Sequence, residues 1–130
     1  MAVNKTSLSA GSIIRSILLD DSAVNSITKN IFPVVTDKAI LPYILYRRMS
    51  LLHNATKANQ PGADTIQLEV ICYTEKYIDG INLAEAVRAA LDYSQGEEDG
   101  LVMRSCVLSD SEEAWQDDAY VQQLVFSIKI

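Results

Sequence analysis

A strand that opens on a proline is the feature that most constrains how this chain can fold. Residues 41–49 read LPYILYRRM, so Pro42 stands just before an aromatic, partly apolar run. Because proline has no N–H donor, it belongs at the start or the edge of a strand and not in a sheet centre. The residues after it alternate between two faces, as in a strand. This extended segment falls between a helical lead and three further strand-like segments.

Two stretches have the spacing of amphipathic helices. The first covers about residues 7–19 and ends at Asp20-Asp21, after which a short second helix runs to about Lys29. The clearest helix begins at Asp79, which can cap it, and runs to about Tyr93. Apolar residues recur in both at intervals of three and four positions, which places them on one stripe of a helix. The members of these stripes are Ala10, Ile13, Ile14, Ile17, Leu18, Leu83, Ala84, Val87, Ala90 and Leu91.

Further strands are predicted at residues 65–73, 101–108 and 120–130, with a brief extended piece at 31–35. Residues 51–64 form a long connection that ends in a Pro-Gly turn signal, so an antiparallel hairpin with a long loop is the simplest pairing. The last segment would span roughly 36 Å at about 3.3 Å per residue, which is long for a small domain. We therefore expect part of it to project or to pair with a neighbour.

These segments predict one α+β domain over residues 1–130. Its expected architecture is an antiparallel sheet of about four strands with the two main helices packed on one face. No apolar run approaches the roughly 20 residues needed to cross a bilayer, and the start of the chain lacks the features of a secretory signal. We expect a cytoplasmic protein whose Cys72 and Cys106 are free, buried thiols.

Charge is unevenly distributed along the chain. The formal net charge is −6; residues 1–64 hold seven Lys/Arg and four Asp/Glu, whereas residues 65–130 hold four and thirteen. An acidic protein without clustered Lys/Arg is poorly suited to hold phosphate backbones, which disfavours sequence-reading DNA or RNA binding. Two interpretations remain open: a solubilising surface, or two oppositely charged faces that meet in a head-to-tail assembly.

Catalytic patterns are missing from the sequence. It has no Gly-rich phosphate loop, metalloprotease helix, nucleophile elbow or Cys-x-x-Cys pair. His53, the single histidine, is expected as a solvated loop residue, with a role as general base as the alternative. The carboxylates of residues 109–118 match no calcium-loop spacing, so an acidic loop is favoured over a cation site. We predict neither a metal nor a cofactor.

Contact elements are the better candidates for function. Trp115, the sole tryptophan, stands inside the acidic 109–118 segment, where it either folds back over the sheet edge or stays accessible as an interface anchor. The 51–64 connection is long enough to be a functional loop. Our candidate contact residues are Arg47, Arg48, His53, Lys57, Trp115, Asp117 and Asp118.

The order of these segments is similar to that of the tail-completion, or tail-terminator, proteins of long-tailed bacteriophages. The shared order comprises the N-terminal helix ending near Asp20, the Ile31-Phe32-Pro33 piece, the Leu41–Tyr46 strand, the 66–73 strand, the helix at 82–91 and a final strand after Asp117-Asp118. Each motif is common by itself, and the specificity comes from order and spacing over almost the whole chain. The acidic Trp115 segment and the length of the 51–64 loop have no match in the family.

The resemblance implies a structural protein of the virion neck, assembled in the bacterial cytoplasm. It would form a ring, commonly of six subunits, that caps the tail tube protein and meets the head-completion protein, with DNA passing through unbound. Such families have no catalytic residues. The alternatives are a protein-binding adaptor of cellular origin and a metal-dependent enzyme that uses His53 and the acidic segment.

Overall fold

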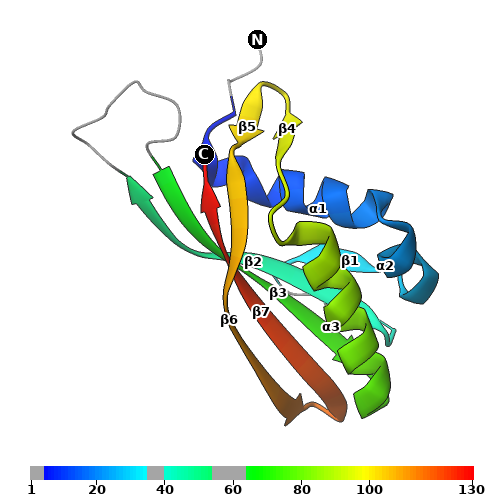
Figure 1. Cartoon of the computed structure of the whole chain (residues 1–130). Coiled ribbons are helices and arrows are strands. Elements are labelled where there is room, and N and C mark those ends of the chain that lie inside the picture. The colour runs from blue at the N-terminus through cyan, green and yellow to red at the C-terminus, as the bar shows by residue number, and fades with distance from the viewer. Residues whose placement is uncertain (1–4, 35–39, 54–63) are drawn as a thin grey trace.

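The computed structural model describes residues 5–34, 40–53 and 64–130, which form helices packed on one side of a sheet (Figure 1). The helical elements are η1 (Ser7–Ser9), α1 (Ala10–Asp20), α2 (Ser22–Ile27) and α3 (Tyr77–Leu91). The strands are β1 (Ile31–Pro33), β2 (Tyr43–His53), β3 (Asp64–Thr74), β4 (Gly96–Glu98), β5 (Leu101–Met103), β6 (Ser105–Gln116) and β7 (Ala119–Lys129). The α+β prediction is confirmed.

The main sheet has five strands in the order β1-β2-β3-β7-β6, and β4 and β5 form a separate two-stranded ribbon. All neighbours in the main sheet are antiparallel except β1 and β2, which run parallel. The predicted hairpin with a long loop is therefore present as β2 and β3, which pair from Tyr43↔Tyr73 to His53↔Asp64. The prediction of about four strands missed the short parallel β1 as a sheet member.

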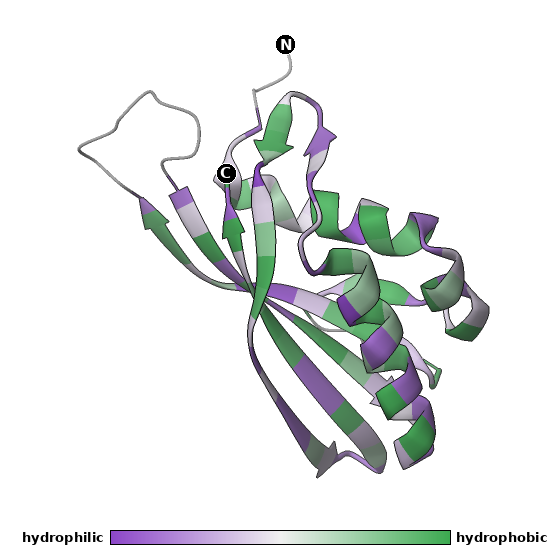
Figure 2. Cartoon of the chain, viewed as in Figure 1, coloured by the Kyte–Doolittle hydropathy of each residue, from purple (hydrophilic) through white to green (hydrophobic). Residues whose placement is uncertain are grey.

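The core lies between the helices and one face of the sheet. Alternate residues of β3 point into it, and Ile66, Leu68, Val70 and Cys72 are fully buried there. Phe126 and Ile128 of β7 pair with Leu68 and Ile66, so the buried face of the central strands is apolar. Figure 2 shows hydrophobic and hydrophilic residues alternating along these strands. The helices cover it with the stripes that the sequence predicts: Ala10, Ile13, Ile14, Leu18, Leu83, Val87 and Leu91 are all buried.

Helix α1 approaches the sheet closely because one of its residues lacks a side chain. A Cβ placed on Gly11 would lie 3.0 Å from Cε2 of Tyr46, which is tighter than normal packing allows. The predicted helix at 7–19 begins with the 3₁₀ turn η1 before α1. Helix α3 begins at Tyr77 and not at Asp79, which lies in its first turn. In that turn, the carboxylate of Asp79 still interacts favourably with the positive end of the helix dipole.

The acidic segment 109–118 is not a loop, which corrects the sequence prediction. Its residues through Gln116 form the second half of β6, paired with β7 as far as Gln116↔Ala119. Pairing with β7 outweighs the polar composition, because an edge strand exposed to water needs few apolar side chains. The predicted 101–108 strand is also divided at Arg104 into β5 and β6.

The final strand does not project from the sheet. Strand β7 pairs with β3 from Tyr120 to Lys129 and with β6 from Ala119 to Lys129. Its unusual length is explained by neighbours of similar length on both sides within one molecule. The expectation that part of it projects or pairs with a neighbouring molecule was wrong.

Candidate interaction surface

The hairpin between β6 and β7 ends in a tight two-residue turn. Asp117 and Asp118 both have positive φ, at 52° and 59°, between the paired residues Gln116 and Ala119. Positive φ at both central positions is the type I′ geometry, which matches the twist of the flanking strands. The turn therefore holds two predicted contact residues, both exposed, at the extreme tip of the sheet.

An aromatic cluster lies directly behind this tip. The ring of Tyr120 meets Trp115 edge-on at 4.7 Å between centroids and meets Tyr77 of α3 edge-on at 5.8 Å. These geometries are favourable for aromatic pairs. Trp115 nevertheless keeps 58% of its surface exposed. The side chain thus contacts its own sheet, as one alternative predicted, and remains accessible, as the other did.

Hydrogen bonds fix the base of the aromatic cluster. Tyr77 Oη donates to Glu113 Oε2 at 2.9 Å, and Gln122 Nε2 donates to the same oxygen at 2.9 Å. The bond from Gln122, followed by that from Tyr77, lowers the pKa of the Glu113 carboxyl. The bond to Glu113 raises the pKa of Tyr77 in turn. Glu113 thereby ties β6 to the start of α3 as a carboxylate.

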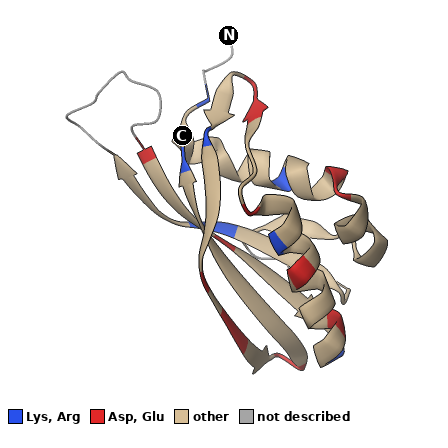
Figure 3. Cartoon of the chain, viewed as in Figure 1, with Lys and Arg blue, Asp and Glu red and all other residues tan. Residues whose placement is uncertain are grey.

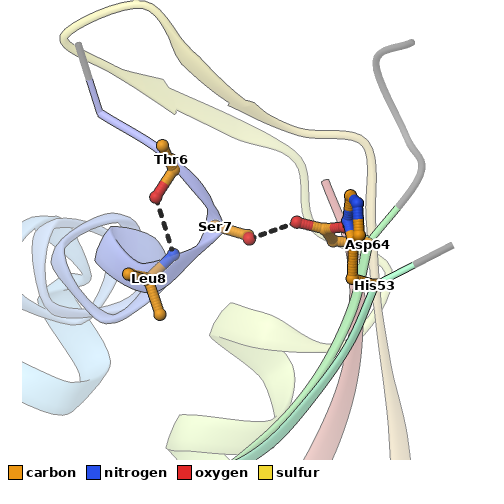
Figure 4. A network of polar contacts seen from close by, with 5 residues as sticks. All are labelled: Thr6, Ser7, Leu8, His53 and Asp64. Atoms are coloured by element: carbon orange, nitrogen blue, oxygen red, sulfur yellow. Dashed lines mark hydrogen bonds and ion pairs between the residues drawn. The ribbon is translucent and has the colours of Figure 1, made fainter. Parts of the chain in front are cut away.

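A second polar cluster lies at the opposite end of the sheet, where β2 ends and β3 begins (Figure 4). His53 Nδ1 lies 2.6 Å from Asp64 Oδ1, and the hydroxyl of Ser7 donates to Asp64 Oδ2. The bond from Ser7, followed by that from His53, holds the pKa of Asp64 below its usual range. His53 therefore belongs to a strand end and not to a solvated loop, which corrects its sequence assignment.

This cluster contains the residue types of a hydrolytic triad in the wrong order. The Ser7 hydroxyl donates to the Asp64 carboxylate. Ser7 is buried, with 4% of its surface exposed. In a nucleophilic triad the hydroxyl must instead face the imidazole that takes its proton. These hydrogen bonds connect η1 to the end of β2 and the start of β3.

Arg47 has a partner within its own sheet. Its Nε lies 2.6 Å from Glu69 Oε1, and Gln123 donates to the other oxygen of the same carboxylate. Glu69 is almost fully buried, on the face of the sheet away from the helices. A buried carboxylate needs such partners. Arg48 lies on the helix side, where its Nη1 donates to the Leu8 carbonyl at 3.1 Å.

The enzyme alternative loses its geometric basis in this fold. His53 pairs with Asp64 at one end of the sheet, whereas Trp115 pairs with Tyr120 at the other, and β3 and β7 run the distance between them. Within one molecule, the histidine and the acidic segment are therefore too far apart to act together on one substrate. Among the described residues, no group of three or more His, Cys, Asp or Glu side chains could hold a metal ion.

The structure separates the predicted contact residues into distinct regions. Trp115, Asp117 and Asp118 lie at the hairpin tip, which is conspicuously acidic (Figure 3). Arg47 and Arg48 lie midway along β2, and His53 lies at its end. Lys57, with most of the 51–64 connection, lies outside the described residues. None of the helices in the described ranges is long and apolar enough to span a membrane.

Sequence reasoning missed three features of this surface. Tyr77 and Tyr120 complete the aromatic cluster, and Ser7 and Asp64 hold His53. Beyond Leu108, the outer edge of β6 has no neighbouring strand among the described residues. The Gln116–Ala119 turn carried a usable signal, because Asp tolerates positive φ in two-residue hairpins. The unpaired edge of β6 cannot be recognised from the sequence, because the N–H and C=O groups that define it belong to the backbone and not to particular side chains.

No protein-family model matches the sequence, and no curated protein matches it. Among solved structures, the fold is similar to that of a chain in the "Virion of native gene transfer agent (GTA) particle". The two have a TM-score of 0.79 and 15% sequence identity, and the likeness covers 95% of this chain and 98% of that chain. At this identity the comparison establishes a common fold over nearly the full length of both chains.

Proposed function

We propose that this protein is a structural component of a tailed-phage or phage-derived particle, acting at the neck as a tail-completion protein. The observation that carries the proposal is the fold shared with a virion chain across 95% of this chain and 98% of that one. The order of segments in the sequence supports the same role independently, through its resemblance to tail-terminator proteins. The accessible aromatic tip and sheet edges supply surfaces for contacts between proteins.

The mechanism is assembly, without bond making or breaking. Copies join into a ring, which caps the tail tube protein on one side and meets the head-completion protein on the other. A repeated head-to-tail contact closes when its rotation divides a full turn. The exposed Trp115 suits such a contact, because tryptophan concentrates binding energy where it is covered by a partner.

DNA passes through the ring without being held. With a net charge of −6 and an acidic hairpin tip, the protein repels the duplex and offers few counter-charges to it. The protein is thus a virion component that contacts nucleic acid in passing.

Deletion of the gene from the phage or prophage that encodes it tests this role. We expect heads and tails that remain separate, with tail tubes lacking a defined end, in negative-stain electron microscopy. Supplying the intact gene from a plasmid should restore joined particles, and mass spectrometry of purified virions should detect the protein. Normal joined particles after the deletion would contradict the proposal.

The adaptor alternative makes a different prediction in the same experiment. An adaptor of cellular origin would use the exposed Trp115 tip to bind one partner protein. Deletion of its gene would leave the particles unaffected. Neighbouring genes separate the two roles further, since head, portal and tail genes accompany a neck protein.

A further inference from the structure

In the part of the chain that the structure describes, the main sheet has an unpaired stretch of strand on each side. Strand β6 is the outermost strand on one side, and on the other side β1 covers only part of β2. Unpaired edges present rows of N–H and C=O groups that can accept a strand from another molecule. The two stretches are not equivalent, and each can be located from its hydrogen bonds.

The open part of β6 begins after Leu108. The segment that follows α3 covers the edge before that point: Asp92 Oδ1 accepts from the N–H of Leu108 at 2.9 Å, and Tyr93 N–H donates to the carbonyl of Cys106 at 2.6 Å. A bulge follows between Leu108 and Asp110. From Asp110 to Gln116 every residue is exposed.

Hydrogen bonding of Ser111 shows which backbone groups face outward. Its N–H donates to Asp110 Oδ1 at 2.9 Å. The alternation of an antiparallel ladder then turns the N–H groups of Ser111, Glu113 and Trp115 away from β7. The same alternation turns the flanking Gln116 toward its partner Ala119, as a two-residue turn requires.

The open part of β2 begins after Tyr46. The carbonyl of Tyr46 accepts from Val34 N–H at 2.8 Å, and Ile44 N–H donates to Asn30 O at 2.8 Å, so the β1 side covers the strand up to this point. From Arg47 to His53 no described strand pairs with this side of β2. Met49 and Leu52 are 46% and 71% exposed there.

The two open stretches have opposite charge and equal length. Residues 110–116 contain Asp110, Glu112 and Glu113 and no Lys or Arg, whereas residues 47–53 contain basic side chains and no Asp or Glu. Glu69 offsets the charge of Arg47, which leaves Arg48 as the lasting cation of this stretch. Like charges on the two β6 edges of a symmetric dimer would repel, so unlike edges are the favoured pairing.

We infer that β6 of one copy pairs with the open half of β2 in the next copy, so that the sheet continues from molecule to molecule. The occupant of each edge is therefore a second copy of this chain. This inference rests on the proposed ring and specifies its interface. Because β2 and β6 run in opposite directions in one sheet, copies related by rotation about an axis inclined to the strands by the tilt of a closed sheet form an antiparallel joint.

The joint requires a stagger that a closed sheet can accommodate. Arg47 and Asp110 lie in the same row of the sheet, so their open stretches extend toward opposite ends. Bringing them together shifts each copy along the strands by five to six residues, roughly 18 Å, over a repeat of four strands (β2, β3, β7 and β6) about 19 Å wide. The resulting strand tilt is roughly 43°, which falls in the usual range for closed sheets.

Site-directed cross-linking of the purified chain tests this joint. One variant carries Gln116→Cys on β6 and the other Ser50→Cys on β2, and the two are mixed with a short bismaleimide. The native thiols give little background, because burial raises the pKa of both Cys72 and Cys106 to about 12. We expect the mixed pair to cross-link at least tenfold faster than a mixture of Gln116→Cys with Glu85→Cys, whose cysteine lies on an exposed position of α3.

A proline at the outer edge then tests the backbone pairing itself. Ser111→Pro removes an N–H that faces away from β7, so the fold should persist, as far-ultraviolet circular dichroism can verify. In the Gln116→Cys chain, Ser111→Pro should reduce cross-linking at least tenfold, whereas the matched Ser111→Ala should leave it unchanged. Equal rates for the Ser50 and Glu85 mixtures would overturn the inference, and so would equal rates for a folded proline variant and the alanine variant.

These outcomes are separable from those of the gene deletion. If the cross-linking fails while deletion still separates heads from tails, the neck role stands and another interface builds the ring. If the deletion leaves particles joined while cross-linking succeeds, the chain self-associates by its edges and the neck role is wrong.

Discussion

At the scale of single residues, Asp64 connects parts of the chain that are far apart in sequence. Its carboxylate accepts from Ser7 in η1 and lies against His53 of β2, and its carbonyl accepts from Ile130 N–H at 3.2 Å. One residue thus links the start of the described chain and the end of β7 to the loop end of the β2–β3 hairpin. The sequence shows each of these residues but not their meeting, because residues so far apart are brought together only by the sheet.

The lowered pKa of Asp64 makes this fastening sensitive to acid. A carboxyl whose pKa is depressed on folding stabilises the fold above its unfolded value of about 3.9, and the contribution disappears as pH falls through the folded pKa. We expect Asp64→Asn to lower the melting temperature by a few degrees at pH 7, with a difference from wild type that shrinks toward pH 3.

Thermal unfolding followed by circular dichroism across this pH range measures the effect. Asp20→Asn, at an exposed helix end, is the matched control and should show no such convergence. Glu113, whose pKa is also lowered, keeps part of the acid sensitivity in both variants. A constant gap between Asp64→Asn and wild type from pH 7 to pH 3 would refute the assignment.

At the scale of elements, the sequence predicted the helices and strands in which apolar residues recur at a regular spacing. The stripes of α1 and α3 and the alternation of β3 are present as predicted, because a periodic apolar face determines both the element and its orientation. The second half of β6 could not be predicted in this way, since its residues are exposed and its conformation comes from pairing with β7. The candidate contact residues stay a prediction, and their separation into distinct regions of the sheet could not be foreseen from the sequence.

The β6–β7 turn predicts a stabilising substitution. Asp118 occupies the second central position of the type I′ turn with φ of 59°, where glycine carries no steric cost. We expect Asp118→Gly to stabilise the fold by about 0.5–1 kcal/mol and to raise the melting temperature by roughly 2–5 °C.

Ser111→Gly, in the same hairpin but within the strand, is the matched control. Glycine weakens a strand interior, so this variant should melt below wild type. Denaturant titration of both variants gives the free energies of unfolding. A destabilised Asp118→Gly would show that the Asp118 side chain makes a contact that outweighs its backbone strain.

At the scale of the whole molecule, the sheet order joins the two differently charged halves of the chain. Strand β2 belongs to the basic half, whereas β3, β7 and β6 belong almost wholly to the acidic half. The ion pair between Arg47 of β2 and Glu69 of β3 therefore joins the two halves. The sequence suggested that the basic half would meet the acidic half of a neighbouring subunit. The Arg47–Glu69 pair already joins the two halves within one molecule. The contacts between copies are therefore assigned to the unpaired edges of β2 and β6.

Protection from hydrogen exchange should follow the sheet order. Strands β3 and β7 each have neighbours on both sides and fully bury Ile66, Leu68, Phe126 and Ile128, so opening them requires near-global unfolding. We expect their amides to exchange slowest, and those of residues 110–116 to exchange fastest among the long strands. Mass spectrometry of exchanged peptides measures this order, and strong protection of residues 110–116 in the monomer would contradict the open edge.

The central position of β7 also has a consequence for biosynthesis. Among the described strands, β6 pairs with β7 alone, and β3 has β2 and β7 as neighbours. While a ribosome is still adding residues 119–129, the β2–β3 hairpin and β6 have no ladder between them. Maturation of the sheet therefore awaits the last strand to emerge, and a copy interrupted before Ala119 would expose the inner side of β6 as well as its outer one.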